Sequence, residues 1–184
     1  MSKFTDNASE KLLVVAGKIS NQKHMASIKN AFYTLMPVIL TGAFCTLISN
    51  VVCSTTTTGI SLAKLPGMSW LGMFTDLFTA ANYATLNFFT VAAVFLIGME
   101  LAKQNGLGDS PDSGVVAVCS FISVLPTYVV TTVNDVQVTV PNVLGKDYTA
   151  ARGLFLGMVI ALVSVEIYSK FVKSHVFDFK MPDT

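Results

Sequence analysis

The residue types that carry most enzyme and metal chemistry are few in this sequence, and their spacing does not bring them together. His24 and His175 lie in polar segments without an obvious carboxylate or cysteine partner. Cys45, Cys53 and Cys119 lie in or at the edge of apolar stretches without metal-ligand spacing, so we interpret them as small side chains that face lipid or the protein core. Paired carboxylates, a nucleophile elbow and a glycine-rich phosphate motif are absent from the sequence. We therefore predict no catalytic residue, no metal site and no cofactor in this chain.

The elements that would have to position any functional group are long apolar segments. Hydrophobic residues make up 52% of the chain and charged residues only 12%, about half of what an ordinary globular protein carries. Several charge-free windows are longer than the roughly 20 residues that a helix needs to cross a bilayer. The 12 basic and 11 acidic residues nearly cancel, so the composition gives no indication of nucleic-acid binding. The pattern predicts an all-α integral membrane protein with about four transmembrane helices, at residues 32–53, 78–99, 114–133 and 149–169.

Basic residues are distributed unequally between the two sides that these spans define. Nine lie in the N-terminal segment, the second loop or the tail, and three lie on the other side, namely Lys64, Lys146 and Arg152. The positive-inside rule therefore predicts that both termini are cytoplasmic. We divide the chain into a cytoplasmic amphipathic arm (1–29), a transmembrane scaffold and dimerisation domain (30–170) and a cytoplasmic tail (171–184).

Two shorter elements accompany the predicted spans. Residues 8–20 have a helical period with one apolar face, which favours a helix on the inner leaflet; a short helix packed on the protein is the alternative. Residues near 128–141 are rich in β-branched side chains and alternate after Asn134 and Asp135. This pattern predicts a short extracellular β-hairpin with a two-residue turn.

Local signals predict where helices begin and where they carry polar groups. Pro37 predicts a kink in the first span or the start of its helix. Ser110-Pro111-Asp112 is typical of a helix start, because serine caps, proline suits the first position and aspartate favours the positive end of the dipole. Asp76, Asn82 and Asn87 make the approach to the second span polar. They line a water-filled passage or, as we favour, form caps and interhelical hydrogen bonds.

The fourth predicted span has a face of small residues. Thr149, Gly153, Gly157 and Ala161 follow one another at intervals of four, and such a face lets two helix backbones approach closely. The pattern alone fits a partner helix in the same chain or in a second subunit equally well. We expect a homodimer through this face, with Gly153, Gly157 and Ala161 as packing residues. Glu166 and Lys170 are spaced for a salt link along the same helix.

Several stretches together resemble the membrane component, enzyme IIC, of bacterial phosphotransferase sugar permeases of the lactose, cellobiose and chitobiose branch. They occur in the order found in that family and span essentially the whole chain. The stretches are residues 11–32, Met36-Pro37-Val38-Ile39-Leu40-Thr41-Gly42-Ala43-Phe44, residues 153–168 and the ending Phe179-Lys180-Met181-Pro182-Asp183.

The resemblance implies a multi-pass protein of the bacterial plasma membrane that takes up a disaccharide or oligosaccharide and couples uptake to phosphorylation. In that family this segment is the first half, associated with dimerisation, and the catalytic and sugar-binding residues lie in the second half. The phosphorylated cysteine belongs to a separate IIB protein, so the resemblance assigns no such role to Cys45, Cys53 or Cys119. Membrane lipid and a second copy are the implied partners, and the IIA and IIB proteins and the sugar require the second half. The alternative is a standalone membrane protein of this descent that binds or regulates another membrane protein.

Overall fold

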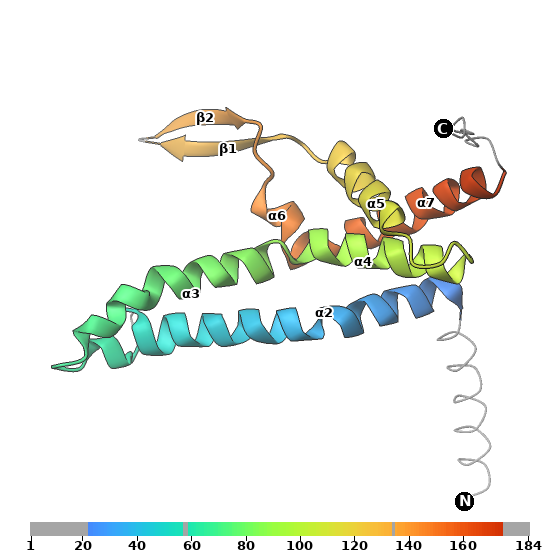
Figure 1. Ribbon diagram of the computed structural model, residues 1–184. Helices are drawn as coiled ribbons and strands as arrows, with labels where there is room; N and C mark the ends of the chain where they lie inside the picture. Colours follow the sequence, from blue (N-terminus) through green and yellow to red (C-terminus); the bar gives the residue numbers. More distant parts are fainter. Residues whose placement is uncertain (1–21, 57–58, 134, 175–184) are drawn as a thin grey trace, which may run out of the picture.

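The computed structural model describes residues 22–56, 59–133 and 135–174, and these are mostly helical (Figure 1). The first half contains α2 (Lys23–Leu47), a π-helical segment (Ile48–Cys53), two 3-10 segments (Leu62–Lys64 and Ser69–Phe74), α3 (Thr75–Asn82), a second π-helical segment (Tyr83–Asn87) and α4 (Phe89–Gln104). The second half contains α5 (Pro111–Val124), strands β1 (Tyr128–Val133) and β2 (Val136–Pro141), the short α6 (Lys146–Thr149), a 3-10 turn (Ala151–Gly153) and α7 (Leu154–Lys173).

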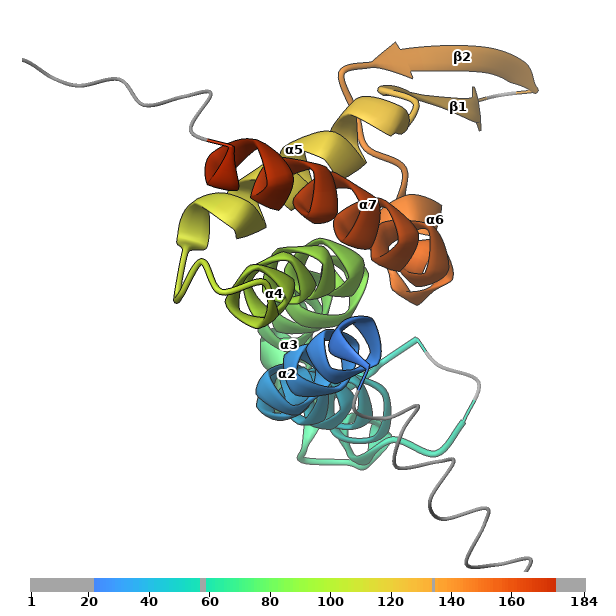
Figure 2. The same cartoon turned by 90° about the vertical axis from the view of Figure 1, so that its right-hand side faces the viewer.

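Helix α4 forms the centre of the helical bundle. Figure 2 shows it between α2 on one side and α5 and α7 on the other. Ala93, Val94 and Ile97 of α4 have no exposed surface. Gly98 lets α5 approach closely, because a Cβ added there would lie 2.8 Å from the Cβ of Ala117. The residues of α4 therefore form the core against which the other helices pack.

Helices α2 and α3 continue together past the bundle (Figure 1). We call residues 40–87 the α2–α3 extension. Many of its large apolar side chains are exposed, although phenylalanine and leucine side chains are buried in the core. Examples are Phe44 (63% exposed), Leu77 (62%) and Met73 (81%). Such a surface is expected where lipid or another protein replaces water.

Among the described residues, two helices, or three if a bent pair counts as one span, are long and apolar enough to cross a membrane, so the predicted number of about four spans is not confirmed. Lys23–Cys53 and Ala151–Lys173 are long and apolar enough to cross a membrane. The pair Ser69–Asn87 and Phe89–Gln104 makes a third span if its 42° bend is accommodated. Helix α5 is apolar but has only 14 residues, which is about 21 Å of helix against a bilayer core of about 30 Å.

The third predicted span, 114–133, is wrong in its second half. The helix ends at Val124, and the chain becomes a strand at Tyr128. Leu125 has an extended backbone, with φ −84° and ψ 148°, because a following proline disfavours helical geometry. At the other end the predicted start is confirmed, with Pro111 as the first helical residue, although the Ser110 side chain makes no capping hydrogen bond.

The predicted β-hairpin is confirmed. Strands β1 and β2 pair antiparallel, and Val133 opposite Val136 leaves two residues between the strands. Asp135 has φ +63°, as a tight two-residue turn requires. Every residue of the two strands except Val129 is exposed. The strands project from the bundle beside α6 (Figure 1).

The outer helices differ from the predicted spans mainly at their ends. Helix α2 begins at Lys23 and passes through Pro37, so this proline does not mark the start of the helix. Helix α7 begins at Leu154, five residues after the start of the fourth predicted span, and runs on to Lys173; the residues before it form the end of α6 and a 3-10 turn. The predicted amphipathic helix at 8–20 and His175 lie outside the described residues.

Candidate functional site

The small-residue face of α7 packs against α4 within one chain. A Cβ added at Gly157 would lie 2.7 Å from Val94 Cγ2 and 2.9 Å from Thr90 Cγ2. Both distances are too short for a real side-chain atom without movement of the neighbours. Ala161, one turn further along, has no exposed surface. Gly157 and Ala161 thus bring the backbones of α7 and α4 close together.

Gly153 serves a different purpose from its two neighbours on the predicted face. It ends the 3-10 turn before α7, and an added Cβ would overlap the backbone carbonyl of Tyr148. Thr149 is also buried there, and Thr90 of α4 donates a 2.6 Å hydrogen bond to the carbonyl of Ala150. This end of the face anchors the turn that leads into α7.

These contacts concern the surface expected for a homodimer. Of the two partners that the pattern allows, the structure supplies the one in the same chain, because Thr90 and Val94 already fill the space beside Gly157. The homodimer itself stays a prediction.

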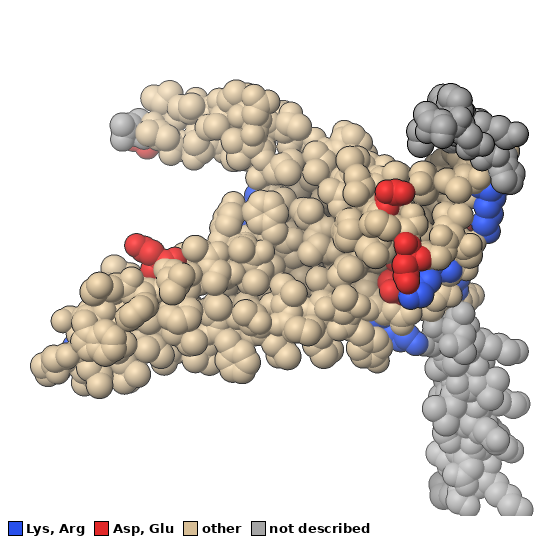
Figure 3. Space-filling view, viewed as in Figure 1, with Lys and Arg blue, Asp and Glu red and all other residues tan. Residues whose placement is uncertain are grey.

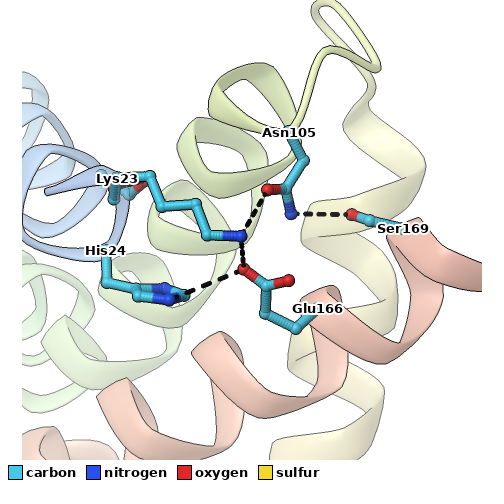
Figure 4. Close-up of polar contacts among 6 residues, drawn as sticks. Lys23, His24, Asn105, Glu166 and Ser169 are labelled. Atoms are coloured by element: carbon cyan, nitrogen blue, oxygen red, sulfur yellow. Dashed lines mark hydrogen bonds and ion pairs between the residues drawn. The ribbon is translucent and has the colours of Figure 1, made fainter.

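A polar cluster joins the start of α2 to the end of α7 (Figure 4). The ammonium of Lys23 lies 2.5 Å from Glu166 Oε1 and donates a 3.0 Å hydrogen bond to Asn105 Oδ1. Asn105, which follows α4, donates a 3.2 Å bond to the Ser169 hydroxyl. His24 Nε2 is 3.7 Å from the same oxygen of Glu166. We call these five residues the latch.

The latch corrects two expectations from the sequence. Glu166 pairs with Lys23 across helices and not with Lys170 along its own helix. His24, for which the sequence offered no carboxylate partner, lies next to Glu166. The signal available was the predicted topology, which placed the N-terminal segment and the end of the fourth span on the same side. Because the charges of the latch are already paired with one another, its role is to hold the ends of three helices together.

An uncharged polar contact lies in the α2–α3 extension, at the other end of α2. The side-chain amide of Asn82 donates hydrogen bonds to the Thr46 hydroxyl and to the carbonyl of Gly42. The expected interhelical hydrogen bonding is therefore confirmed at Asn82. Charged side chains, in contrast, gather mainly near the end of the molecule where α2 begins and α7 ends (Figure 3).

Comparison with known proteins identifies a family and relatives that share this sequence pattern. The model of the family described as "Phosphotransferase system, EIIC" matches residues 29–184. The chain belongs to this family. This EIIC chain is 29% identical to the lichenan permease IIC component of Bacillus subtilis (strain 168) over its whole length. It is 28% identical over 96% of its length to the oligo-beta-mannoside-specific EIIC component of the same organism.

A solved structure shares the fold of this EIIC chain. The crystal structure is that of ChbC, the IIC component from the N,N'-diacetylchitobiose-specific phosphotransferase system. It matches 95% of the chain with a TM-score of 0.75 at 26% identity, and the match covers 39% of ChbC. The chain likewise spans 39% of the lichenan permease component and 37% of the oligo-beta-mannoside component. It therefore corresponds to well under half of each relative.

Proposed function

We propose that this chain is the scaffold and dimerisation part of a phosphotransferase permease for a disaccharide or oligosaccharide. The observation that carries the proposal is the family match over residues 29–184, together with relatives named for lichenan, cellobiose and oligo-beta-mannoside. Uptake by the complete permease is coupled to phosphorylation by the IIA and IIB proteins. This chain supplies the membrane framework on which the remainder of the permease acts.

The packing of the described residues supports a framework role. Helix α4 is covered by α2, α5 and α7, and the latch ties the ends of α2, α4 and α7. The bundle is thus built around its own apolar core. Its polar side chains at the helix ends bind one another, which suits positioning better than catalysis.

A groove on the bundle offers an apolar surface for the proposed second subunit. It has a volume of about 640 Å³ and lies across α2, the π-helical segment 83–87, α4 and α5. Val38, Phe88, Phe95 and Val118 are among its lining residues. Unlike the face of Gly157, this surface is open. We propose that it, rather than the small-residue face, contributes to the dimer.

For the orientation we propose that both termini are cytoplasmic, as the positive-inside rule predicts. The ends of α2 and α7 that carry Lys23, Lys170 and Lys173 meet at the latch. The hairpin would then lie outside the cell. Among single-cysteine variants of a chain with its three native cysteines replaced, Gln137→Cys should react with an impermeant reagent in intact cells and His175→Cys should not.

Sugar phosphorylation tests the proposed function. In cells lacking other permeases for cellobiose, three proteins are compared: this chain, the cellobiose-specific EIIC component of Geobacillus stearothermophilus, and a chimera in which this chain replaces the matched part of that component. With the IIA and IIB proteins present, the chain alone should form no cellobiose phosphate, and the chimera should form it. Sugar phosphate from the chain alone would contradict the framework role, as would an inactive chimera that reaches the membrane in normal amounts.

A further inference from the structure

A second polar feature, distinct from the latch, is a recess in the α2–α3 extension. It has a volume of about 210 Å³, enough for about seven water molecules at ~30 Å³ each. Five uncharged polar side chains line it, from the end of α2, the π-helical segment 48–53 and α3: Thr46, Ser49, Asn50, Thr79 and Asn82. We call this the polar recess.

Hydrogen bonds within the polar recess use its amide nitrogens and leave its amide oxygens available. Asn82 donates to Thr46 and Gly42, and Asn50 donates a 2.8 Å bond to the carbonyl of Thr46. The hydroxyls of Ser49 and Thr79 are 3.2 Å apart, and one donates to the other. Among the described residues no donor is bonded to Oδ1 of either asparagine. The recess therefore presents two carboxamide acceptors beside a pair of hydroxyls.

The surroundings decide what kind of molecule can fill the recess. It lies along Lys23–Cys53, a helix apolar and long enough to cross a membrane. An amide or hydroxyl that faces hydrocarbon without a partner is strongly unfavourable, so an acyl chain is a poor occupant. Since no charged side chain lines the recess, an ion would also lose its hydration without compensation. A neutral molecule rich in hydroxyl groups meets both conditions, because each hydroxyl donates and accepts.

The walls of the recess are held at a fixed separation. Gly42 lies against the opposite helix, and an added Cβ there would be 2.7 Å from Leu86 Cγ. One π-helical segment, Ile48–Cys53, forms part of one wall, and a second, Tyr83–Asn87, directly follows the α3 residues of the other wall. Such segments are rare and occur frequently at functional sites. Close packing at Gly42 and a π-helical segment in one wall are features of a preformed pocket.

We propose that the polar recess binds a small neutral polyhydroxyl compound, of the size of one sugar ring, through Asn50, Asn82, Ser49 and Thr79. The ligand hydroxyls donate to the two carboxamide oxygens and exchange hydrogen bonds with the Ser49–Thr79 pair. Identification of that compound as a sugar rests on the proposed function. The recess is a second site, separate from the sugar site that the resemblance implies for the other half of such permeases.

Binding to the full chain in lipid nanodiscs tests the proposal, with glucose as the neutral probe and glucose 6-phosphate as the charged one. Saturation-transfer NMR should detect glucose on the wild-type chain, and glucose 6-phosphate should bind at least ten-fold more weakly. Asn50→Leu should weaken glucose binding at least ten-fold. It is the preferred variant because Asn50 is exposed and donates only within its own helix. Asn82→Leu should have at least the same effect, and Gln137→Leu, an exposed change in the hairpin, should have none.

Two results would overturn the proposal. One is a wild-type chain that binds no glucose, which would leave the recess with water only. The other is unchanged glucose binding by Asn50→Leu and Asn82→Leu when both variants fold as wild type. Neither result bears on the permease assignment, which stands or falls on sugar phosphate formation by the chimera. Conversely, an inactive chimera leaves the binding measurement intact.

Discussion

The bundle around α4 and the α2–α3 extension both carry large apolar side chains but use them differently. In the bundle, side chains such as Ile97, Leu101 and Phe121 have no exposed surface. In the extension, Phe44 and Leu77 are more than 60% exposed. In a membrane, hydrophobicity alone does not distinguish the inside of a protein from its lipid-facing surface. Small residues and polar contacts mark the packed surfaces in both regions, at Gly157 and at Gly42.

The largest expected effect comes from filling the packed surface of the bundle. Gly157→Leu would drive a side chain into Val94 and Thr90, and we expect it to destabilise the fold by about 3 kcal/mol or more, because overpacking a close contact typically costs 1–3 kcal/mol per small insertion. Thermal unfolding in detergent, followed by circular dichroism, measures the change. Val163→Leu, on an exposed position of α7, is the control. Equal stability of the two variants would mean that α7 does not pack on α4 as described.

A matched substitution in the extension should have a smaller and local effect. Gly42→Leu would collide with Leu86, and we expect about 1–3 kcal/mol of local destabilisation while the bundle stays folded, because α3 makes its contacts within the extension. Trp70, the single tryptophan of the chain, lies in the extension and reports on it. Its fluorescence should change while the circular-dichroism midpoint falls less than for Gly157→Leu. A Gly42→Leu variant that unfolds the whole chain would make the two regions one cooperative unit.

Removing a charge from the latch should weaken the bundle modestly. Glu166→Gln loses the ion pair with Lys23, and because both groups are partly exposed we expect a loss of about 1 kcal/mol, reduced by salt. Unfolding at low and high salt measures it. Lys170→Gln is the control, since Lys170 lies on the same helix one turn away. An equal loss for Lys170→Gln would instead support the link along α7.

Truncating the exposed surface of the extension should have the smallest effect on folding. Leu77→Ala removes a side chain that is 62% exposed, so we expect a stability change within about 0.5 kcal/mol. The same unfolding assay measures it. A loss of 2 kcal/mol or more would show that protein covers this surface in the folded state.

Much of the fold was predictable because its signals are local. The start of α5 follows from the proline at its first position, the turn of the hairpin from its turn residues and the course of α7 from hydropathy. The error in the third predicted span has a local cause as well. Proline at 126 ended α5 early, and β-branched residues that look apolar enough for a span became β1.

Local sequence signals could not predict the latch or the partner helix of the small-residue face, because both depend on how the helices are arranged in the fold. The spacing of Glu166 and Lys170 predicts a solvated salt link along one helix, and only the meeting of α2 with α7 gives Glu166 its partner in Lys23. Likewise, small residues at intervals of four on one helix face predict close packing, but they do not show whether the partner helix belongs to the same chain or to a second one. That choice depends on where α4 lies.

Disulfide trapping tests most directly whether α7 packs on α4 of its own chain. In a chain with Cys45, Cys53 and Cys119 replaced, Thr90→Cys and Gly157→Cys place two thiols within reach, since a Cβ at 157 is 2.9 Å from Thr90 Cγ2. Oxidation in membranes should give a cross-linked monomer. Mixing chains that each carry one of the two cysteines should give no covalent dimer. Covalent dimers from the mixture, without cross-linked monomer from the double variant, would show that this face joins two subunits and would contradict the packing of α7 on α4 within one chain.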